Sequence, residues 1–257
     1  MENIMNLHQR VVLIAGPMST TVASIVLSLT RLGADCVILD PDKSVLSSFI
    51  NQINDGHEVN SKFGRAMVIQ SDFKTAEEVK DAVGRAAQSF GGLDIFIDAL
   101  MIQGPTPMSY DGSIENYDAL IDKHLKLPLM LTQNVMAYLK SRKRGRVIFL
   151  LSQSPVAKIK LDIVGAAVRS GLINFSKALA KQASEFNVTV NTLSIALTEE
   201  YILAHDPESK TIKEAMEKIK AMDPSIKVTE ADKVSQTVAF IVSPMGATIN
   251  GQNFELS

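Results

Sequence analysis

Short apolar runs alternate with amphipathic stretches along the whole chain. The apolar runs lack polar alternation, which is typical of strands that are covered on both faces of a parallel sheet. They fall at residues 11–15, 36–39, 66–69, 94–97, 147–151 and 188–193. Between them, helical spacing of apolar residues predicts helices at about 19–32, 44–54, 75–90, 113–142 and 162–186. Strands that alternate with helices form right-handed βαβ units, so the pattern predicts a doubly wound α/β fold.

No internal repeat, low-complexity tract or Pro/Gly-rich linker divides the chain, so we predict one domain over residues 1–257. One segment departs from the alternation. It is a charged stretch at about 198–227, in which apolar residues follow helical spacing at Ile212, Ala215, Met216 and Ile219. Lids over α/β sites lie in helical excursions beyond the carboxyl edge of the sheet. We therefore expect this segment to be a helical lid.

Composition excludes several classes of protein. Lys plus Arg number 26 against 28 Asp plus Glu, giving a net charge of −2, so no global positive field exists to hold nucleic acid. The single cysteine, Cys36, excludes a disulfide scaffold and a Cys-rich zinc site, and the four histidines are too scattered for a helix-face metal motif. No apolar run approaches the ~20 residues that span a bilayer. We expect a cytoplasmic protein with no metal and no membrane partner.

A local basic run, Lys-Ser-Arg-Lys-Arg-Gly-Arg, occupies residues 140–146. Cations complement the macrodipole at the C-terminus of a helix. Because the chain as a whole is slightly acidic, we interpret the run as a solvated helix end and not as a nucleic-acid site.

Seven scaffold motifs follow one another along the chain. They are Val-Val-Leu-Ile-Ala-Gly (11–16), Leu-Gly-Ala-Asp (32–35), Gly-Gly-Leu-Asp-Ile (91–95), Gly-Arg-Val-Ile (145–148), Val-Asn (190–191), Val-Ala-Phe-Ile-Val-Ser (238–243) and Ile-Asn-Gly-Gln (249–252). Their order and spacing resemble the short-chain dehydrogenase/reductase family, and most closely its β-ketoacyl carrier-protein reductase branch. The resemblance covers essentially the whole chain. It implies a Rossmann-like domain with a seven-stranded parallel sheet.

The resemblance assigns three residues to a dinucleotide. Gly16 matches the first glycine of the family's glycine-rich turn, Asp40 matches the acid that binds the adenosine ribose of NAD, and Asp72 matches the residue that contacts adenine. The other two glycines of the turn are Thr20 and Val22 here. Those glycines let the backbone approach a pyrophosphate closely, so their loss disfavours binding.

Further substitutions point the same way. The family's Asn-Asn-Ala-Gly after the fourth strand is replaced by residues 98–101, which end in Met101, and its Pro-Gly after the sixth strand is Ile195-Ala196. We expect Thr20, Val22 and Met101 to fill the dinucleotide groove, so that no cofactor, or only weakly held NAD(H), binds. A hydroxyl of Ser19 or Thr20 is expected to cap the helix and not to hold phosphate.

The family's catalytic set is largely absent. Ser152 matches its serine, but the general-acid tyrosine aligns with Gly165 and the lysine four residues on with Arg169. No Tyr-x-x-x-Lys occurs anywhere in the chain, and the family's helical asparagine aligns with His124. A glycine cannot supply a proton, and an arginine stays protonated and does not tune a pKa as lysine does.

The helix expected at 162–186 carries small residues at Gly165, Ala166, Ala167 and Gly171. Small residues allow close helix packing, and in the family this helix forms a dimer interface. We expect it to pair two-fold with its copy, together with the helix at 113–142, in a homodimer or homotetramer. An active relative of the same family is an alternative partner.

Three functions remain open from the sequence. The favoured hypothesis is a non-catalytic member of the fold that acts as a binding or regulatory subunit. The second is an atypical NAD(H)-dependent reductase that uses Gly16, Asp40, Asp72, Ser152 and Arg169. The third is hydrolysis by a Ser152–His124 pair, for which no acid partner or oxyanion loop is evident.

Overall fold

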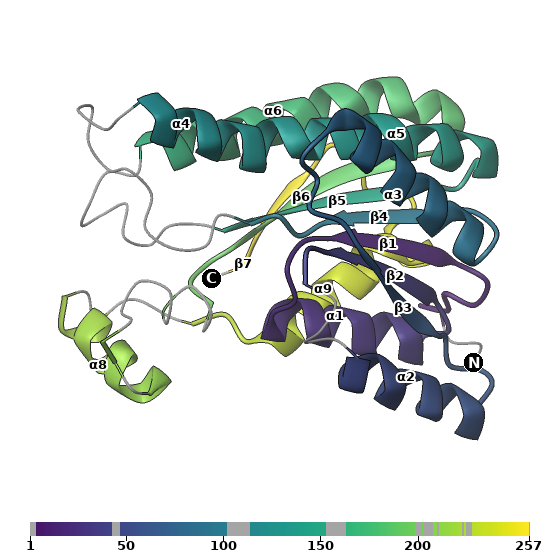
Figure 1. Ribbon diagram of the computed structural model, residues 1–257, viewed down its shortest axis with the longest axis horizontal. Coiled ribbons are helices and arrows are strands. Elements are labelled where there is room, and N and C mark those ends of the chain that lie inside the picture. The colour runs from purple at the N-terminus through teal and green to yellow at the C-terminus, as the bar shows by residue number, and fades with distance from the viewer. Residues whose placement is uncertain are drawn as a thin grey trace.

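A seven-stranded parallel sheet with helices on both faces organises the molecule (Figure 1). The computed structural model describes residues 4–42, 47–101, 114–152, 163–198, 202, 208–209, 211–222, 224 and 228–256. The strand order is β3-β2-β1-β4-β5-β6-β7. The strands are β1 (Val11–Ala15), β2 (Asp35–Asp40), β3 (Ala66–Gln70), β4 (Ile95–Asp98), β5 (Arg146–Ser152), β6 (Thr189–Ile195) and β7 (Asn253–Leu256). The predicted doubly wound α/β fold and its seven-stranded sheet are confirmed.

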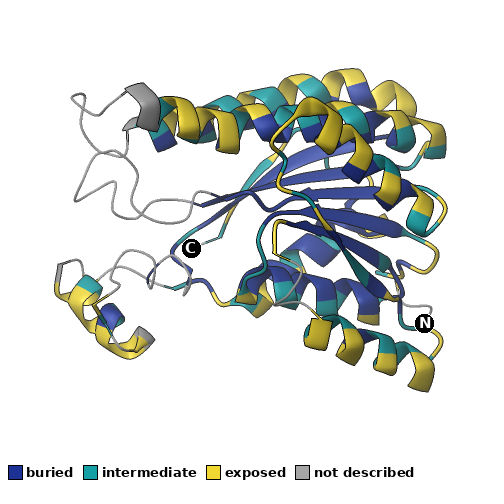
Figure 2. Ribbon diagram, in the orientation of Figure 1, coloured by how far each residue is buried: buried dark blue, intermediate teal, exposed yellow. Residues whose placement is uncertain are grey.

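The helices form one layer on each face of the sheet. The first layer contains α1 (Thr20–Arg31), α2 (Ser47–Val59) and α9 (Ala231–Val242), and the second contains α3 (Ala76–Ser89), α5 (Leu127–Arg142) and α6 (Ile163–Ala183). Alternate strand residues enter the two cores, so that in β1 Ile14 faces the first layer and Leu13 the second. Figure 2 shows the central strands buried, the edge strands β3 and β7 partly exposed, and the outer helix faces exposed. Burial on both faces explains the uniformly apolar strands.

Polar side chains fix where two helices begin. The Oγ of Ser19 accepts the Val22 N–H at 3.1 Å and caps α1. At α3, the Oγ1 of Thr75 accepts the Glu78 N–H at 3.1 Å, while the Glu78 carboxylate accepts the Lys74 N–H at 2.8 Å. These bonds satisfy N–H groups that have no partner within the helix. The expected capping role of Ser19 is thus confirmed.

The long helix expected at 113–142 is interrupted by a π-helical turn. α4 (Ile114–Ile121) continues into η2 (Asp122–Lys126), and α5 begins at Leu127. The Leu127 N–H donates to the carbonyl of Asp122, five residues back. Pro128 has no N–H for the carbonyl four residues before it, so the regular helical ladder cannot continue through this point. Such turns are frequent at functional sites, and this one contains His124.

At the amino edge of the sheet, a buried carboxylate joins two of the scaffold motifs. Asp94 accepts the Val11 N–H at 3.1 Å and the Arg144 Nε–H at 2.8 Å, and Arg10 lies 3.5 Å away. Arg144 belongs to the basic run at 140–146, which spans the end of α5 and the start of β5. The run includes the C-terminus of α5, as interpreted, but several of its cations have structural partners: Lys140 lies over the Phe186 ring, Arg142 donates to the Gly91 carbonyl, and Arg144 pairs with Asp94.

The helix α8 (Ile212–Met222) lies beyond the carboxyl edge of the sheet (Figure 1). Its Ala215 is buried in a small cluster with Leu197 and Ile202, separate from the two cores of the sheet. The helix expected from the spacing in the segment about 198–227 is present. Its role as a lid stays a prediction, because most of residues 199–210 lie outside the described part of the chain.

Candidate functional site

The carboxyl ends of β1 and β4 lie side by side, at the point where the strand order reverses. Ala15 and Asp98 are partners in register, and Gly16 and Ala99 follow them. Ligands of open α/β sheets bind at such a switch point. Gly16 has a φ of 149°, and a Cβ built on it would lie 2.5 Å from the Ala99 carbonyl oxygen. The predicted cofactor residue Gly16 is therefore at the expected edge, and close backbone packing accounts for the glycine.

The Asp40 carboxylate is already hydrogen-bonded within the chain. The side chain is buried at the end of β2, where one oxygen accepts the Met18 N–H and the other accepts the Asp42 N–H, both at 2.7 Å. The first of these bonds ties the turn after β1 to the end of β2. Each carboxylate oxygen has a second lone pair that can still accept a hydroxyl, so the two bonds orient the carboxylate without using up its capacity. The ribose role that the resemblance assigns to Asp40 stays a prediction.

One backbone N–H at the N-terminus of α1 is also hydrogen-bonded within the chain, and the side chain of Val22 does not lie where the sequence suggested. Ser19 caps the Val22 N–H, one of the donors at a helix start that hold a pyrophosphate in this kind of fold. Thr20 is exposed, so its side chain is free of the core. The Val22 side chain, however, is 1% exposed and packs in the core with Ile25. The expectation that Val22 projects into the groove is wrong, because helical spacing turns it toward the sheet.

Met101 also packs in the core. It continues the alternation of β4, in which Ile95, Ile97 and Ala99 face the α1–α9 layer, and it is 6% exposed. The expectation that it fills the dinucleotide groove stays a prediction.

A chain of hydrogen bonds links β4 to the π-helical turn through one residue. The Leu100 N–H donates to the Asp98 carboxyl at 3.2 Å, and the Leu100 carbonyl accepts from Nδ1 of His124 at 2.6 Å. Burial raises the pKa of Asp98 to about 7. Burial also lowers the pKa of His124, an effect that the hydrogen bond to Leu100 opposes and that the nearby Lys123 reinforces. Both groups are buried titratable side chains at the switch point.

Sequence reasoning did not assign a role to Asp98. Its signal was a carboxylate that ends an otherwise apolar strand, which is also common in turns. Only the observed burial distinguishes Asp98 from Asp72. Asp72 lies just after β3, is exposed and pairs with Lys74 at 2.6 Å.

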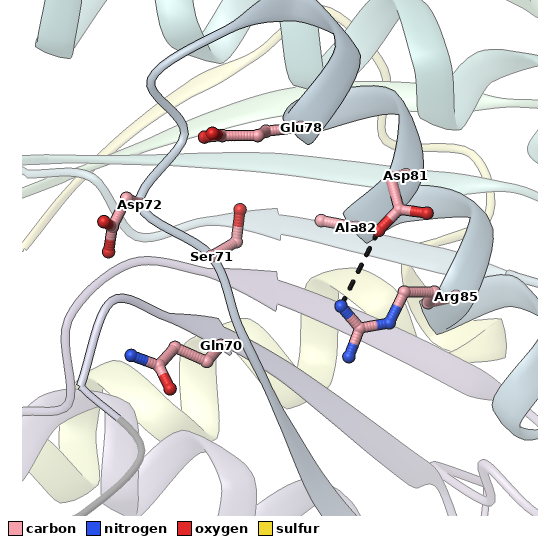
Figure 3. Close-up of a pocket in the computed structure, with 7 residues that line it drawn as sticks. All are labelled: Gln70, Ser71, Asp72, Glu78, Asp81, Ala82 and Arg85. Atoms are coloured by element: carbon pink, nitrogen blue, oxygen red, sulfur yellow. Dashed lines mark ion pairs between the residues drawn. The ribbon is translucent and has the colours of Figure 1, made fainter.

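Asp72 lies between two cavities. The smaller one, of about 270 Å³, is formed by the loop after β3 and one face of α3 (Figure 3). It is mainly polar, and the Asp81–Arg85 pair at 3.6 Å crosses its wall. Glu78 also lines it but is already used in capping α3. Among the described residues, no group of acids, histidines or cysteines is arranged to hold a metal ion.

The larger cavity, of about 370 Å³, spans the switch point itself. Its lining is mostly apolar and comes from the turn after β1, the ends of β2, β3 and β4, and the α4–α5 region. The lining residues are Pro17, Pro41, Asp72, Phe73, Leu100, Ala119, Asp122, Lys123 and Leu127. Of the three predicted cofactor residues, only Asp72 lines this cavity.

The remaining predicted site residues lie on β5 and α6. Ser152 is buried at the end of β5, Gly165 is buried in α6, and Arg169 is half-buried one turn further on. Residues four apart on a helix share a face, so Gly165 and Arg169 lie on the same face of α6. These are the positions that the resemblance aligns with the family's acid and its lysine. The guanidinium of Arg169 offers hydrogen-bond donors and no acceptor.

The hydrolytic alternative gains no support from His124. In a serine hydrolase the Nδ1–H of the histidine donates to a carboxylate, which stabilises the imidazolium. Here the Nδ1 partner is the Leu100 carbonyl, a neutral acceptor.

Within the described ranges, no helix is long and apolar enough to cross a membrane.

The short chain dehydrogenase family model matches residues 10–205. A chloroplastic NADPH-dependent aldehyde reductase-like protein of Arabidopsis thaliana is 27% identical over 252 residues, covering 95% of this chain and 91% of that protein. A 3-oxoacyl-(acyl-carrier-protein) reductase of Thermotoga maritima is 23% identical over 255 residues, or 96% of each chain.

Solved structures agree on the fold. Levodione reductase superposes with a TM-score of 0.81 at 19% identity, over 97% of this chain and 96% of that one. A short chain dehydrogenase of Burkholderia cenocepacia in complex with NADP gives a TM-score of 0.76 at 23% identity, over 98% of both chains. The sheet order, the scaffold motifs and the match over residues 10–205 lead to one conclusion. The chain belongs to the short-chain dehydrogenase family.

Proposed function

We propose that this member of the family does not catalyse hydride transfer and acts as a binding or regulatory subunit, either in a homo-oligomer or beside an active relative. The observation that carries the proposal is on α6, where Gly165 and Arg169 stand in place of the proton donor and the lysine. A positioned acid or base typically contributes about 10²–10⁴-fold to a rate. Neither residue can replace that contribution.

The first βα turn supports the proposal independently. Both oxygens of Asp40 accept backbone N–H groups, and Ser19 caps the helix that would receive a pyrophosphate. A pyrophosphate that used the Val22 N–H would have to displace the Ser19 hydroxyl from it, which reduces the net gain from that contact. Together with the loss of two glycines of the turn at Thr20 and Val22, this leads us to expect that NAD(H) binds weakly or not at all.

Titration with NADH and NADPH tests both points. We expect no melting shift and no change in nucleotide fluorescence at sub-millimolar concentrations, because a ligand far below its Kd does not stabilise the fold. A β-ketoacyl substrate should cause no NADH oxidation. The Thermotoga maritima reductase serves as the positive control under the same conditions. A clear melting shift together with ketone-dependent oxidation would overturn the proposal.

The alternative is an NAD(H)-dependent reductase with atypical residues, and the NADP complex of the Burkholderia neighbour favours it. In that case Ser152 and Arg169 would orient substrate and ribose, and Arg169→Ala should reduce turnover. Under the alternative, the unsubstituted protein oxidises NADH with a ketone and Arg169→Ala lowers that rate. Under the proposed function, neither protein shows turnover.

A further inference from the structure

The cavity at the switch point has the size and walls of a small-molecule site. Its volume of about 370 Å³ is near the lower end of the ~300–1,000 Å³ that is typical of ligand pockets. Its walls are predominantly apolar, with proline rings of Pro17 and Pro41 and the side chains of Phe73, Leu100 and Leu127. These dimensions suit a compact apolar body.

The charges that line the cavity leave one cation uncompensated. Asp72 pairs with Lys74 at 2.6 Å, and Asp122 pairs with Lys126 at 3.1 Å. Lys123 is exposed, lines the same cavity and forms no ion pair with any residue that the structure describes. The two acids are thus neutralised by their own partners, and the ammonium of Lys123 is the charge available to a ligand.

The backbone conformation of Phe73, which lines the cavity, is a second and independent indication of a ligand-binding site. Its φ of 56° lies in the left-handed region, which a bulky residue without a local hydrogen-bonding side chain rarely adopts. Backbone strain of this kind persists where the surroundings hold it, and it clusters at ligand-binding positions. The Phe73 side chain packs against the core and also lines the cavity.

We propose that this cavity binds a small apolar monocarboxylate, with its apolar body between the turn after β1 and Phe73 and its carboxylate beside Lys123. The inference rests on the proposed function, because a bound dinucleotide would occupy the same edge of the sheet. Burial of an apolar body supplies most of the affinity, and the single cation selects an anion over its neutral analogue.

Two probes of the same shape test the ligand class. We use 2-naphthoate and the neutral 2-naphthamide, and measure both by calorimetry and melting temperature. We expect the carboxylate to bind about two- to five-fold more tightly, the range that an exposed ion pair gives. Lys123→Gln should abolish this preference. The control Lys80→Gln, which removes an exposed lysine of α3 outside the cavity lining, should keep it.

A third variant locates the site. Ala119 is exposed and lines the cavity, so Ala119→Phe should fill the opening while the chain still folds, as its melting temperature will show. We expect this variant to lose both probes. Equal or tighter binding of the amide, unchanged preference in Lys123→Gln, or unchanged binding in Ala119→Phe would each overturn the inference.

Competition with NADH separates this inference from the proposed function. If naphthoate binds as expected and NADH neither displaces it nor is oxidised, both stand. NADH oxidation with a ketone would overturn the proposed function, and with it the inference that a monocarboxylate is the resident ligand. Absence of naphthoate binding, with NADH also inert, would overturn the inference alone.

Discussion

Replacing Asp98 by asparagine tests whether a buried carboxyl at the switch point limits the stability of this protein above neutral pH. Asp98 is 1% exposed, and burial raises its pKa from 3.8 to about 7. Its carboxyl accepts the Leu100 N–H at 3.2 Å. An asparagine has nearly the same shape, and its amide oxygen can accept the same hydrogen bond but cannot ionise. The substitution therefore removes the charge and keeps the contact.

The sign and size of the effect follow from proton linkage. In the unfolded chain the Asp98 carboxyl ionises near pH 4, whereas in the folded protein it stays protonated until about pH 7. Unfolding therefore releases a proton between these values, and the free energy of unfolding falls as the pH rises from about 4 to 7. A pKa difference of roughly three units, at ~1.36 kcal/mol each, amounts to about 4 kcal/mol lost by pH 8.

Urea unfolding at pH 5 and pH 8 measures this loss. We expect Asp98→Asn to stabilise the protein more at pH 8 than at pH 5, by about 2–3 kcal/mol, because part of the loss has already occurred at pH 5. Any pH-independent effect of the substitution cancels in this difference. The control is Asp81→Asn, whose side chain is 67% exposed, and it should show almost no difference. An equal effect of Asp98→Asn at the two pH values would refute the reasoning.

Three further predictions concern the backbone, assembly and chemistry. Gly16→Ala should lower the free energy of unfolding, measured in urea, by at least ~2 kcal/mol, because its Cβ would lie 2.5 Å from the Ala99 carbonyl oxygen. The control Gly84→Ala in α3, where no atom lies nearer than 3.9 Å to the new Cβ, should stabilise the protein slightly in the same assay. Light scattering should give at least twice 27.9 kDa, and a mass near 27.9 kDa would contradict the expected two-fold pairing. Gly165→Tyr with Arg169→Lys should give no NADH-dependent ketone reduction and should cost about 1–3 kcal/mol of stability, since Gly165 is buried; measurable turnover would show that only the acid was missing.

The fold was predictable because parallel strands covered on both faces give a strong sequence signal. Each run of apolar residues became a strand, fully buried at 147–151 and partly buried at the edge strand β3. The start of α1 followed a cap that can be read locally, Ser19. The π-helical turn at Asp122–Lys126 was not predicted. Helical periodicity is almost the same on both sides of it, and the interruption depends on a single missing donor at Pro128.

The site was predictable only in part, because its geometry depends on contacts between distant segments. The edge of the sheet and the missing acid on α6 could be read from position alone. That Val22 and Met101 would turn into the core depends on packing between α1 and β4, which the aligned glycine positions do not reveal. The hydrogen bond from the Met18 N–H to Asp40 joins residues that are 22 positions apart, so a local sequence pattern does not predict it.

Asp98 and His124 align with asparagines of the family and hold the segment that follows β4. Asp98 and His124 both bond to Leu100, one at its N–H and the other at its carbonyl. An asparagine at either position could make the same kind of bond, so the contacts that hold the segment after β4 do not require the family's residues. Gly16 likewise packs against that segment. Under the proposed function, the change that bears on the reaction is at Gly165, the position that the resemblance aligns with the family's proton donor. A chain that keeps the framework of the site and lacks its acid is what we expect when binding, and not turnover, is the function.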